Sequence, residues 1–74
     1  MNKNKVEYVY SFKNKNNGRI HKIICNKPFK ESTTFAYGEQ EPCYRCETET
    51  ATHWLRKAQF QLIKEEIRIY DMPF

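Results

Sequence analysis

The sequence of 74 residues contains only two glycines and three prolines, and it has no long hydrophobic run. Without such a run, no segment reaches the length of a transmembrane helix, and the start MNKNKVEYVY has neither the apolar region nor the cleavage site of a signal peptide. Two glycines leave few places where the backbone can cradle a phosphate. The HExxH, P-loop and GxSxG motifs are also absent. We therefore expect no enzymatic activity, no small-molecule substrate and no membrane insertion.

Cysteine occurs three times, and an odd number fits poorly with a closed set of disulfides. Without a secretory signal we expect a reducing, cytoplasmic setting, which is the host cytoplasm if the protein is viral. In that setting a CxxC pair is more often metal-binding or catalytic than a structural disulfide. A redox dithiol usually begins a helix in a βαβ unit, and this chain is too short for that fold. A metal site is the use we expect for the cysteines.

The aromatic content, five Phe, five Tyr and one Trp, argues against intrinsic disorder. At this length the residues predict one small domain that spans 1–74. A domain of this size has a small core and often needs a metal, a disulfide or a partner subunit for stability.

The N-terminal segment VEYVYSF alternates with a period of two and predicts a strand with its aromatic residues on one face. The segment KNKNNG then allows a reversal, and RIHKIIC returns as the second strand of a hairpin over about residues 5–26. Pro28 ends this strand. Residues 27–47 form a loop and a metal knuckle, and TTFAYG within them is a candidate short third strand.

From Glu47 onward the pattern changes to a helical one, because apolar residues recur at spacings of three and four. Thr48 or Thr50 suits the N-cap, and acidic residues suit the first turn. A C-terminal α-helix is therefore predicted over about residues 48–68, and the fold class is α+β. The residues on its apolar side are Ala51, Trp54, Leu55, Ala58 and Leu62.

A second apolar stripe lies on another side of the predicted helix. Such a small domain has little material left to cover it, so one interpretation is a dimer or partner surface. The alternatives are that the C-terminal tail covers the stripe, or that the helix ends early and residues 67–70 form a strand. The residues of the stripe are Phe60, Ile63, Ile67 and Tyr70.

Cys43 and Cys46 have the spacing of a zinc knuckle, and Cys25 supplies a third thiolate for a tetrahedral structural site. The fourth ligand is His21 or His53, and geometry complicates both. In a straight strand the Cα atoms of residues 21 and 25 lie about 13 Å apart, so the chain must bend between them. His53 lies seven helical residues past Cys46, about 10 Å along the axis. The residues alone leave the two histidines level.

The run RIHKIICNKP…EPCYRCETET resembles a pattern in small, mostly uncharacterised phage and bacterial proteins. In that pattern H-x3-C is followed by a polar loop, a C-x2-C knuckle and a helix, and the proteins look like zinc-ribbon or treble-clef-like modules. The resemblance covers about residues 19–50. It implies a structural Zn²⁺ and the ligand set His21, Cys25, Cys43 and Cys46. It also implies a phage or mobile-element accessory protein that binds and modulates a host protein.

The charge distribution supplies the alternative functions. Residues 1–30 carry eight Lys/Arg against one acid, and residues 31–74 carry five against eight, which gives +7 and −3 and sums to the net charge of +4. A basic, aromatic hairpin is typical of a nucleic-acid surface, here through Lys13, Lys15, Arg19, Lys22 and Lys27. An inhibitor that mimics an acidic ligand is a third hypothesis, through Glu39, Glu41, Glu47 and Glu49. A protein partner, either a host factor or a second copy, remains our first expectation.

Overall fold

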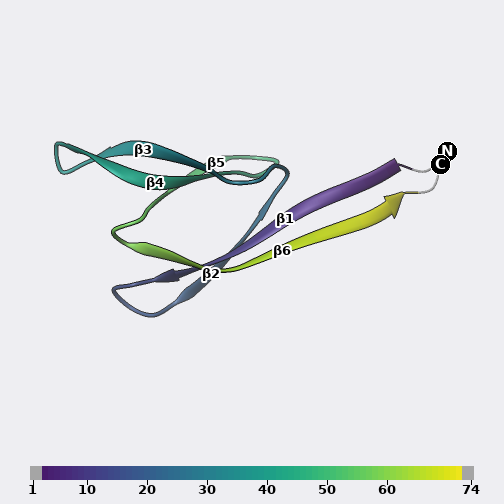
Figure 1. The fold of residues 1–74 in the computed structure, drawn as a ribbon, viewed down its shortest axis with the longest axis horizontal. Coiled ribbons are helices and arrows are strands. Elements are labelled where there is room, and N and C mark those ends of the chain that lie inside the picture. The colour runs from purple at the N-terminus through teal and green to yellow at the C-terminus, as the bar shows by residue number, and fades with distance from the viewer. Residues whose placement is uncertain (1–2, 73–74) are drawn as a thin grey trace.

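The computed structural model describes residues 3–72, and the regular structure within this range consists entirely of β-strands (Figure 1). The predicted domain of residues 1–74 extends beyond the range by two residues at each end. The strands pair only in antiparallel fashion. In chain order they are β1 (Lys3–Asn14), β2 (Ile20–Cys25), β3 (Lys30–Ala36), β4 (Glu39–Glu47), β5 (Thr52–Arg56) and β6 (Phe60–Met72).

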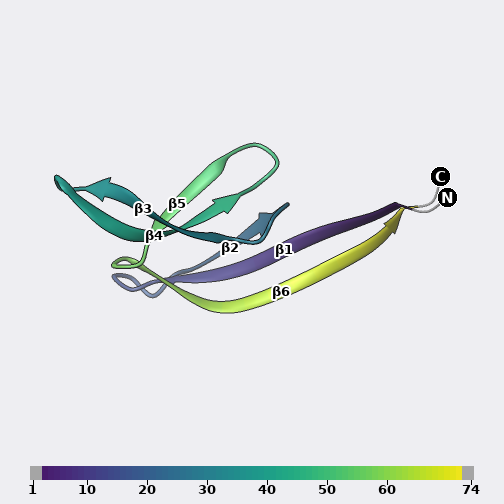
Figure 2. The ribbon, with the colours of Figure 1, turned by 45° about the horizontal axis from the view of Figure 1, so that its top comes forward.

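The strands form two three-stranded sheets, which we name after their central strands. The β1 sheet has the order β2-β1-β6, and the β4 sheet has the order β3-β4-β5. Figure 2 shows them as two layers, with the β4–β5 hairpin curving over the first sheet. The chain therefore completes its first sheet only with its last strand, after the whole second sheet has been built.

Two turns have the residues that their backbone requires. The reversal between β1 and β2 contains Gly18 at φ 73°, and the Asn14 and Asn17 side chains accept hydrogen bonds from the backbone N–H groups of residues 16 and 19 at 2.9 Å. The β3–β4 hairpin turns through Tyr37 and Gly38, which both have positive φ, 54° and 79°. Two such residues match the twist of the flanking strands, although Tyr37 is an unusual residue in that conformation.

The core lies between the facing sides of the two sheets. Tyr10 and Phe12 from β1 meet Tyr44 from β4 and Phe29 from the β2–β3 connection, with ring centroids 5.1 to 5.4 Å apart in tilted or edge-to-face contacts. The Tyr10 hydroxyl accepts a hydrogen bond from the Phe29 backbone N–H at 3.2 Å. Cys25, Cys46 and Leu55 complete the buried set. We call these facing sides the inner faces of the sheets.

The molecule is elongated, with extents of 51 × 23 × 17 Å. Beyond Tyr8, where β2 ends, β1 pairs with β6 alone and the two strands project away from the second sheet (Figure 1). We call this projection, residues 3–8 with 67–72, the ribbon. The rest of the molecule, in which the two sheets face each other, is the body.

The predicted α+β fold is wrong, because residues 48–68 form β5, a turn and most of β6 in place of a helix. What the structure retains of the prediction is the antiparallel pairing of β1 with β2. The helical spacing of Trp54, Leu55 and Leu62 was coincidental, since Leu55 is buried while Trp54 is half exposed on the other side of β5. The β-branched residues of this segment suit strands, and pairing with β1 decides the outcome.

Proline occurs within the central strand β4, where a missing N–H usually weakens the ladder. Pro42 faces Thr33 on β3, whereas the pairing with β5 starts only at Cys43. On the β5 side the Pro42 carbonyl accepts a hydrogen bond from the Lys57 N–H at 3.0 Å, just past the end of that strand. Pro42 therefore lies at a position where no strand is paired on the β5 side, so a backbone N–H is not required there.

Candidate functional site

The predicted zinc knuckle does not form. Cys43 and Cys46 lie on one continuous strand, where residues three positions apart point to opposite faces. Cys46 belongs to the inner face, whereas Cys43 lies on the outer face of the β4 sheet with Ser32 and Arg56 as its neighbours in register. The extended backbone that gives Tyr44 its place in the core is what separates the two thiols.

The other predicted ligands are also dispersed. His21 is exposed on β2, and its ring centroid lies 6.0 Å from that of Phe60. Cys25, four residues further along the strand, is buried. No bend forms at Ile23–Ile24, because β2 pairs in unbroken register with β1 over this span. His53, the alternative ligand, is exposed opposite Cys46. Among the side chains that the structure describes, residues 5–70, no group of three or more His, Cys, Asp or Glu could hold a metal ion.

The interpretation as a zinc-binding, treble-clef-like or zinc-ribbon module is therefore wrong for this fold. A treble clef needs a knuckle and a helix, and the described residues contain neither. The residues present do not fit a four-coordinate zinc, because of the predicted set only Cys25 and Cys46 are buried together in the core, whereas His21 is exposed and Cys43 lies on the outer face. The zinc cofactor itself stays an untested prediction.

The Cys25 and Cys46 thiols face each other between the two sheets, and both are fully enclosed. Burial raises the pKa of Cys25, and burial together with the charge that Cys25 would carry raises the pKa of Cys46 to about 12. Burial also raises the pKa of Cys43. Since the thiolate is the reactive form, these thiols are poor nucleophiles and act as small apolar side chains.

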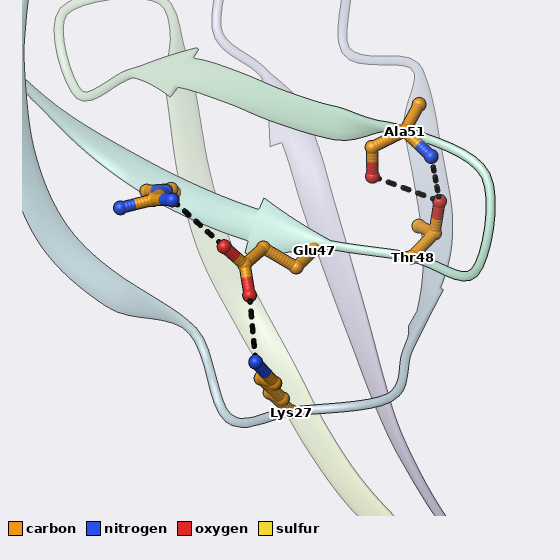
Figure 3. Close-up of polar contacts among 5 residues, drawn as sticks. Lys27, Glu47, Thr48 and Ala51 are labelled. Carbon is orange, nitrogen blue, oxygen red and sulfur yellow. Dashed lines mark hydrogen bonds and ion pairs between the residues drawn. The ribbon is translucent and has the colours of Figure 1, made fainter.

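The two sheets are joined next to this thiol pair. The Asn26 N–H donates to the Glu47 carbonyl at 3.1 Å, and the Glu47 carboxylate lies between Lys27 at 3.7 Å and Arg45 at 2.8 Å (Figure 3). The following turn is closed by Thr48, whose hydroxyl accepts from the Ala51 N–H at 3.1 Å (Figure 3). Lys27 and Glu47 therefore have a local structural role.

The residues of the predicted partner stripe all lie on β6, but they do not share a face. Phe60 packs against the core, whereas Ile63 lies at a β-bulge opposite the step from Ser11 to Phe12. Ile67 lies on the inner face, opposite Tyr8, and Tyr70 lies on the outer face, opposite Lys5. Side chains of a strand alternate between its two faces, so residues that would share one side of a helix lie on both faces of β6.

The ribbon has one apolar face, which the second sheet does not cover. Ile67 and Ile69 lie opposite Tyr8 and Val6 in register, and their exposed fractions are 64% and 65%. Toward the body the face continues into an open groove of about 510 Å³, which is lined by Tyr8, Tyr10, Pro28, Ile67 and two carboxylate residues, Glu65 and Glu66. The sequence prediction missed Ile69, although its alternation with Ile67 was a strand signal. We call Val6, Tyr8, Ile67 and Ile69 the apolar patch.

The opposite face of the same ribbon is charged. Lys5 pairs with Glu7 at 3.8 Å, and Arg68 pairs with Glu66 at 3.1 Å. Hydrogen bonds to Tyr70 and Glu66 raise the pKa of the Arg68 guanidinium. The ribbon is thus amphipathic without a second layer on its apolar side.

The predicted nucleic-acid residues do not all gather on one surface. Lys27 is paired with Glu47, and the Lys15 ammonium donates to the Lys57 carbonyl at 2.8 Å. Lys13 and Lys22 lie on the outer face of the β1 sheet, and the predicted set lacks Lys64, which lies opposite Ser11 on the same face. Arg19 lies next to the turn before β2. The tyrosines of the basic, aromatic hairpin are not fully exposed, because Tyr10 is buried and Tyr8 is half-buried.

The acidic segment is divided between local contacts and solvent. Glu41 pairs with Arg56 at 3.0 Å, and Glu47 is held by Arg45 and Lys27. Glu39 is exposed at the start of β4, and Glu49 is exposed in the turn that follows this strand. These carboxylates therefore form no single acidic surface.

The comparisons with known proteins add no family to these observations. No protein-family model, curated protein or solved structure matches the chain. Between residues 3 and 72 no helix is long and apolar enough to cross a membrane.

Proposed function

We propose that this chain is a non-enzymatic binding module that binds another protein through the apolar patch of its ribbon. The observation that carries the proposal is that Ile67 and Ile69 are about two-thirds exposed, side by side with Val6 and Tyr8, at an end of the β1 sheet that the β4 sheet does not cover. Contiguous apolar patches of this kind are typical of interaction sites.

Other exposed apolar side chains lie next to polar or charged residues and do not form a comparable patch. Ile20 and Ile24 are 60% and 44% exposed on the outer face of the β1 sheet, but Lys22 lies between them on the same face. Phe35 and Tyr37 lie at the tip of the β3–β4 hairpin, next to Gln40 and Glu39. The ribbon combines four adjacent apolar residues on paired strands with a groove at its base.

The partner class follows from the shape and chemistry of the patch. The open groove suits an apolar side chain from a protein better than an enclosed small molecule, because ligand pockets usually bury most of their ligand. The resemblance to phage and bacterial accessory proteins extends the proposal to a host protein in the cytoplasm. Three free cysteines are compatible with that reducing setting.

The experiment compares two isoleucine substitutions on the same sheet. The immobilised full-length chain, its Ile69→Lys variant and its Ile20→Lys variant are exposed to bacterial lysate, and the bound proteins are quantified by mass spectrometry. The two isoleucines are almost equally exposed, at 65% and 60%, so non-specific adhesion should fall equally in both variants. A protein retained by wild type and Ile20→Lys but lost with Ile69→Lys supports the proposal, whereas equal retention by all three chains contradicts it.

A second candidate function is nucleic-acid binding, and the cluster of Lys13, Lys22 and Lys64 favours it. All three are exposed on the outer face of the β1 sheet, and none of them makes an ion pair with a side chain of residues 5–70. Fluorescence anisotropy with labelled duplex and single-stranded DNA over a salt series is the test, since each phosphate contact contributes a slope of about −0.9 on duplex DNA. Charge reversal of the three lysines should abolish binding, while Lys30→Glu on the other sheet should not.

A further inference from the structure

The outer edge of β6 faces no other strand among the described residues, because β6 ends the β1 sheet. Its unpaired backbone N–H and C=O groups can therefore bind a further strand. A bulge at Ile63 interrupts the regular part of this edge, so the segment that can pair without distortion is Lys64–Tyr70. No helix or loop of residues 3–72 donates a backbone hydrogen bond to it.

We propose that a second copy of the chain pairs with this edge, β6 against β6 in antiparallel orientation, about a two-fold axis through Ile67. Antiparallel partners place their side chains on the same face of a sheet. An axis perpendicular to the sheet keeps the apolar patches of both copies on one side. The pairs across the axis are Ile67 with Ile67, Glu66 with Arg68, Glu65 with Ile69, and Lys64 with Tyr70.

The charges along β6 select this register and this partner. With the axis at Ile67, Glu66 of each copy lies opposite Arg68 of the other, which gives two complementary pairs. An axis at Glu66 would oppose two glutamates and bring Lys64 against Arg68. Axes at Glu65 or Arg68 would each oppose two like charges. Among these four registers, the one with its axis at Ile67 is therefore the register that opposes no like charges.

Glu66 and Arg68 already form an ion pair within one chain. Ordering these two side chains in the contact between copies would therefore cost less conformational entropy. Glu66 and Arg68 already contact each other at 3.1 Å on the outer face, so their side chains are held near the positions that the second copy would engage. Two copies then form one network of two carboxylates and two guanidinium groups. On the opposite face the two Ile67 side chains meet at the axis, and the two apolar patches become one surface.

The test uses two charge reversals that should each prevent self-association but restore it when mixed. Glu66→Arg places an introduced arginine opposite Arg68 of the other copy, and Arg68→Glu places an introduced glutamate opposite Glu66. Each variant alone should therefore sediment as a monomer where wild type sediments as a dimer. In a mixture, one copy presents two arginines and the other presents two glutamates. Analytical ultracentrifugation should then recover a heterodimer with an affinity within about tenfold of wild type, since each 1.4 kcal/mol is one factor of ten.

Intrachain repulsion is the same in each variant alone and in the mixture, so the recovery isolates the contact between copies. Glu39→Arg at the start of β4 and Arg19→Glu just before β2 reverse charge at exposed positions away from β6, so they should leave the dimer intact. A wild-type chain that stays monomeric throughout a dilution series would overturn the proposal, and so would a mixture that stays monomeric. Loss of association in Glu39→Arg or Arg19→Glu would contradict the assignment of the contact to the edge of β6.

This dimer does not depend on the proposed function, and the two can fail separately. Arg68→Glu lies outside both the groove and the apolar patch, so a monomeric Arg68→Glu chain should still retain the lysate protein that Ile69→Lys loses. If the chain retains the lysate protein but wild type does not dimerise, the proposed binding function stands and the proposed dimer is wrong. Dimerisation without retention would leave only the second copy as partner.

Discussion

The strands β1 and β6 run through both the body and the ribbon, and the same alternation of side chains has a different outcome in each. In the body the inner-face residues Tyr10 and Phe12 are 4% and 0% exposed, because the β4 sheet lies over them. In the ribbon the inner-face residues Ile67 and Ile69 remain about two-thirds exposed. An alternating strand therefore specifies which face is apolar, and the layer above decides whether that face is a core or a binding surface.

The largest effect is expected at the centre of the body. Phe12→Ala should lower the free energy of unfolding by about 3–5 kcal/mol, because a fully buried ring leaves a cavity beside Tyr10 and Tyr44. Such a loss is a large part of the stability of a small domain. Urea denaturation followed by circular dichroism measures it. Phe35→Ala, at a site 72% exposed, is the matched control and should change stability by less than about 0.5 kcal/mol.

A smaller loss is expected for Cys46→Ser. The hydroxyl would be buried between the sheets with the weakly hydrogen-bonding Cys25 thiol nearest to it, which should cost about 1–3 kcal/mol. The same denaturation experiment measures the loss. Cys46→Ala removes the sulfur without adding a polar group and should cost less than the serine variant. An alanine variant less stable than the serine variant would show that the thiol has a role other than packing.

The stability of the body should also fall in alkaline solution. The pKa of Cys46 is about 12 in the folded chain and about 9 when unfolded, so the unfolded state releases its proton first as the pH rises. The contribution of the neutral thiol is complete below pH 9 and is lost progressively toward pH 12, and the raised pKa of Tyr10 acts in the same direction. Unfolding curves over this range should show a smaller decline for Cys46→Ala than for wild type.

The smallest change in stability is expected in the ribbon. Ile69→Lys should alter the free energy of unfolding by no more than about 0.5 kcal/mol, because the side chain is already mostly in water. Its melting temperature should match that of Ile20→Lys within error. A large destabilisation would mean that the apolar patch is a part of the core, and the distinction between body and ribbon would then fail.

The sequence predicted the first strand because the alternation of Val6, Tyr8, Tyr10 and Phe12 is unbroken and local. It did not predict β6, which pairs Ile69 with Val6 across almost the whole chain. The local sequence carries no information about a pairing between such distant residues. The spacing of Leu55 and Leu62 matched that of a helix by coincidence. The alternative that residues 67–70 form a strand was closer to the structure.

The candidate site was partly visible for a similar reason. Ile67 stood out as an apolar residue without an evident cover, but its neighbour Ile69 belongs to the same face only in a strand. The zinc knuckle was wrongly predicted because CxxC spacing brings two thiols together only in a tight turn. Pairing with β3 and β5 on both sides keeps β4 extended through Cys43 and Cys46, and the separation of the thiols follows.

The far end of the ribbon also determines how the molecule would respond to mechanical force. Lys3 and Met72 are paired in register, so both chain ends leave from the same end of the same two strands (Figure 1). Tension applied between them would load the hydrogen bonds of the ladder one rung after another, in the manner of a zipper, before it reached the body. A force that pulls these two ends apart would therefore dismantle the apolar patch first and the aromatic core last.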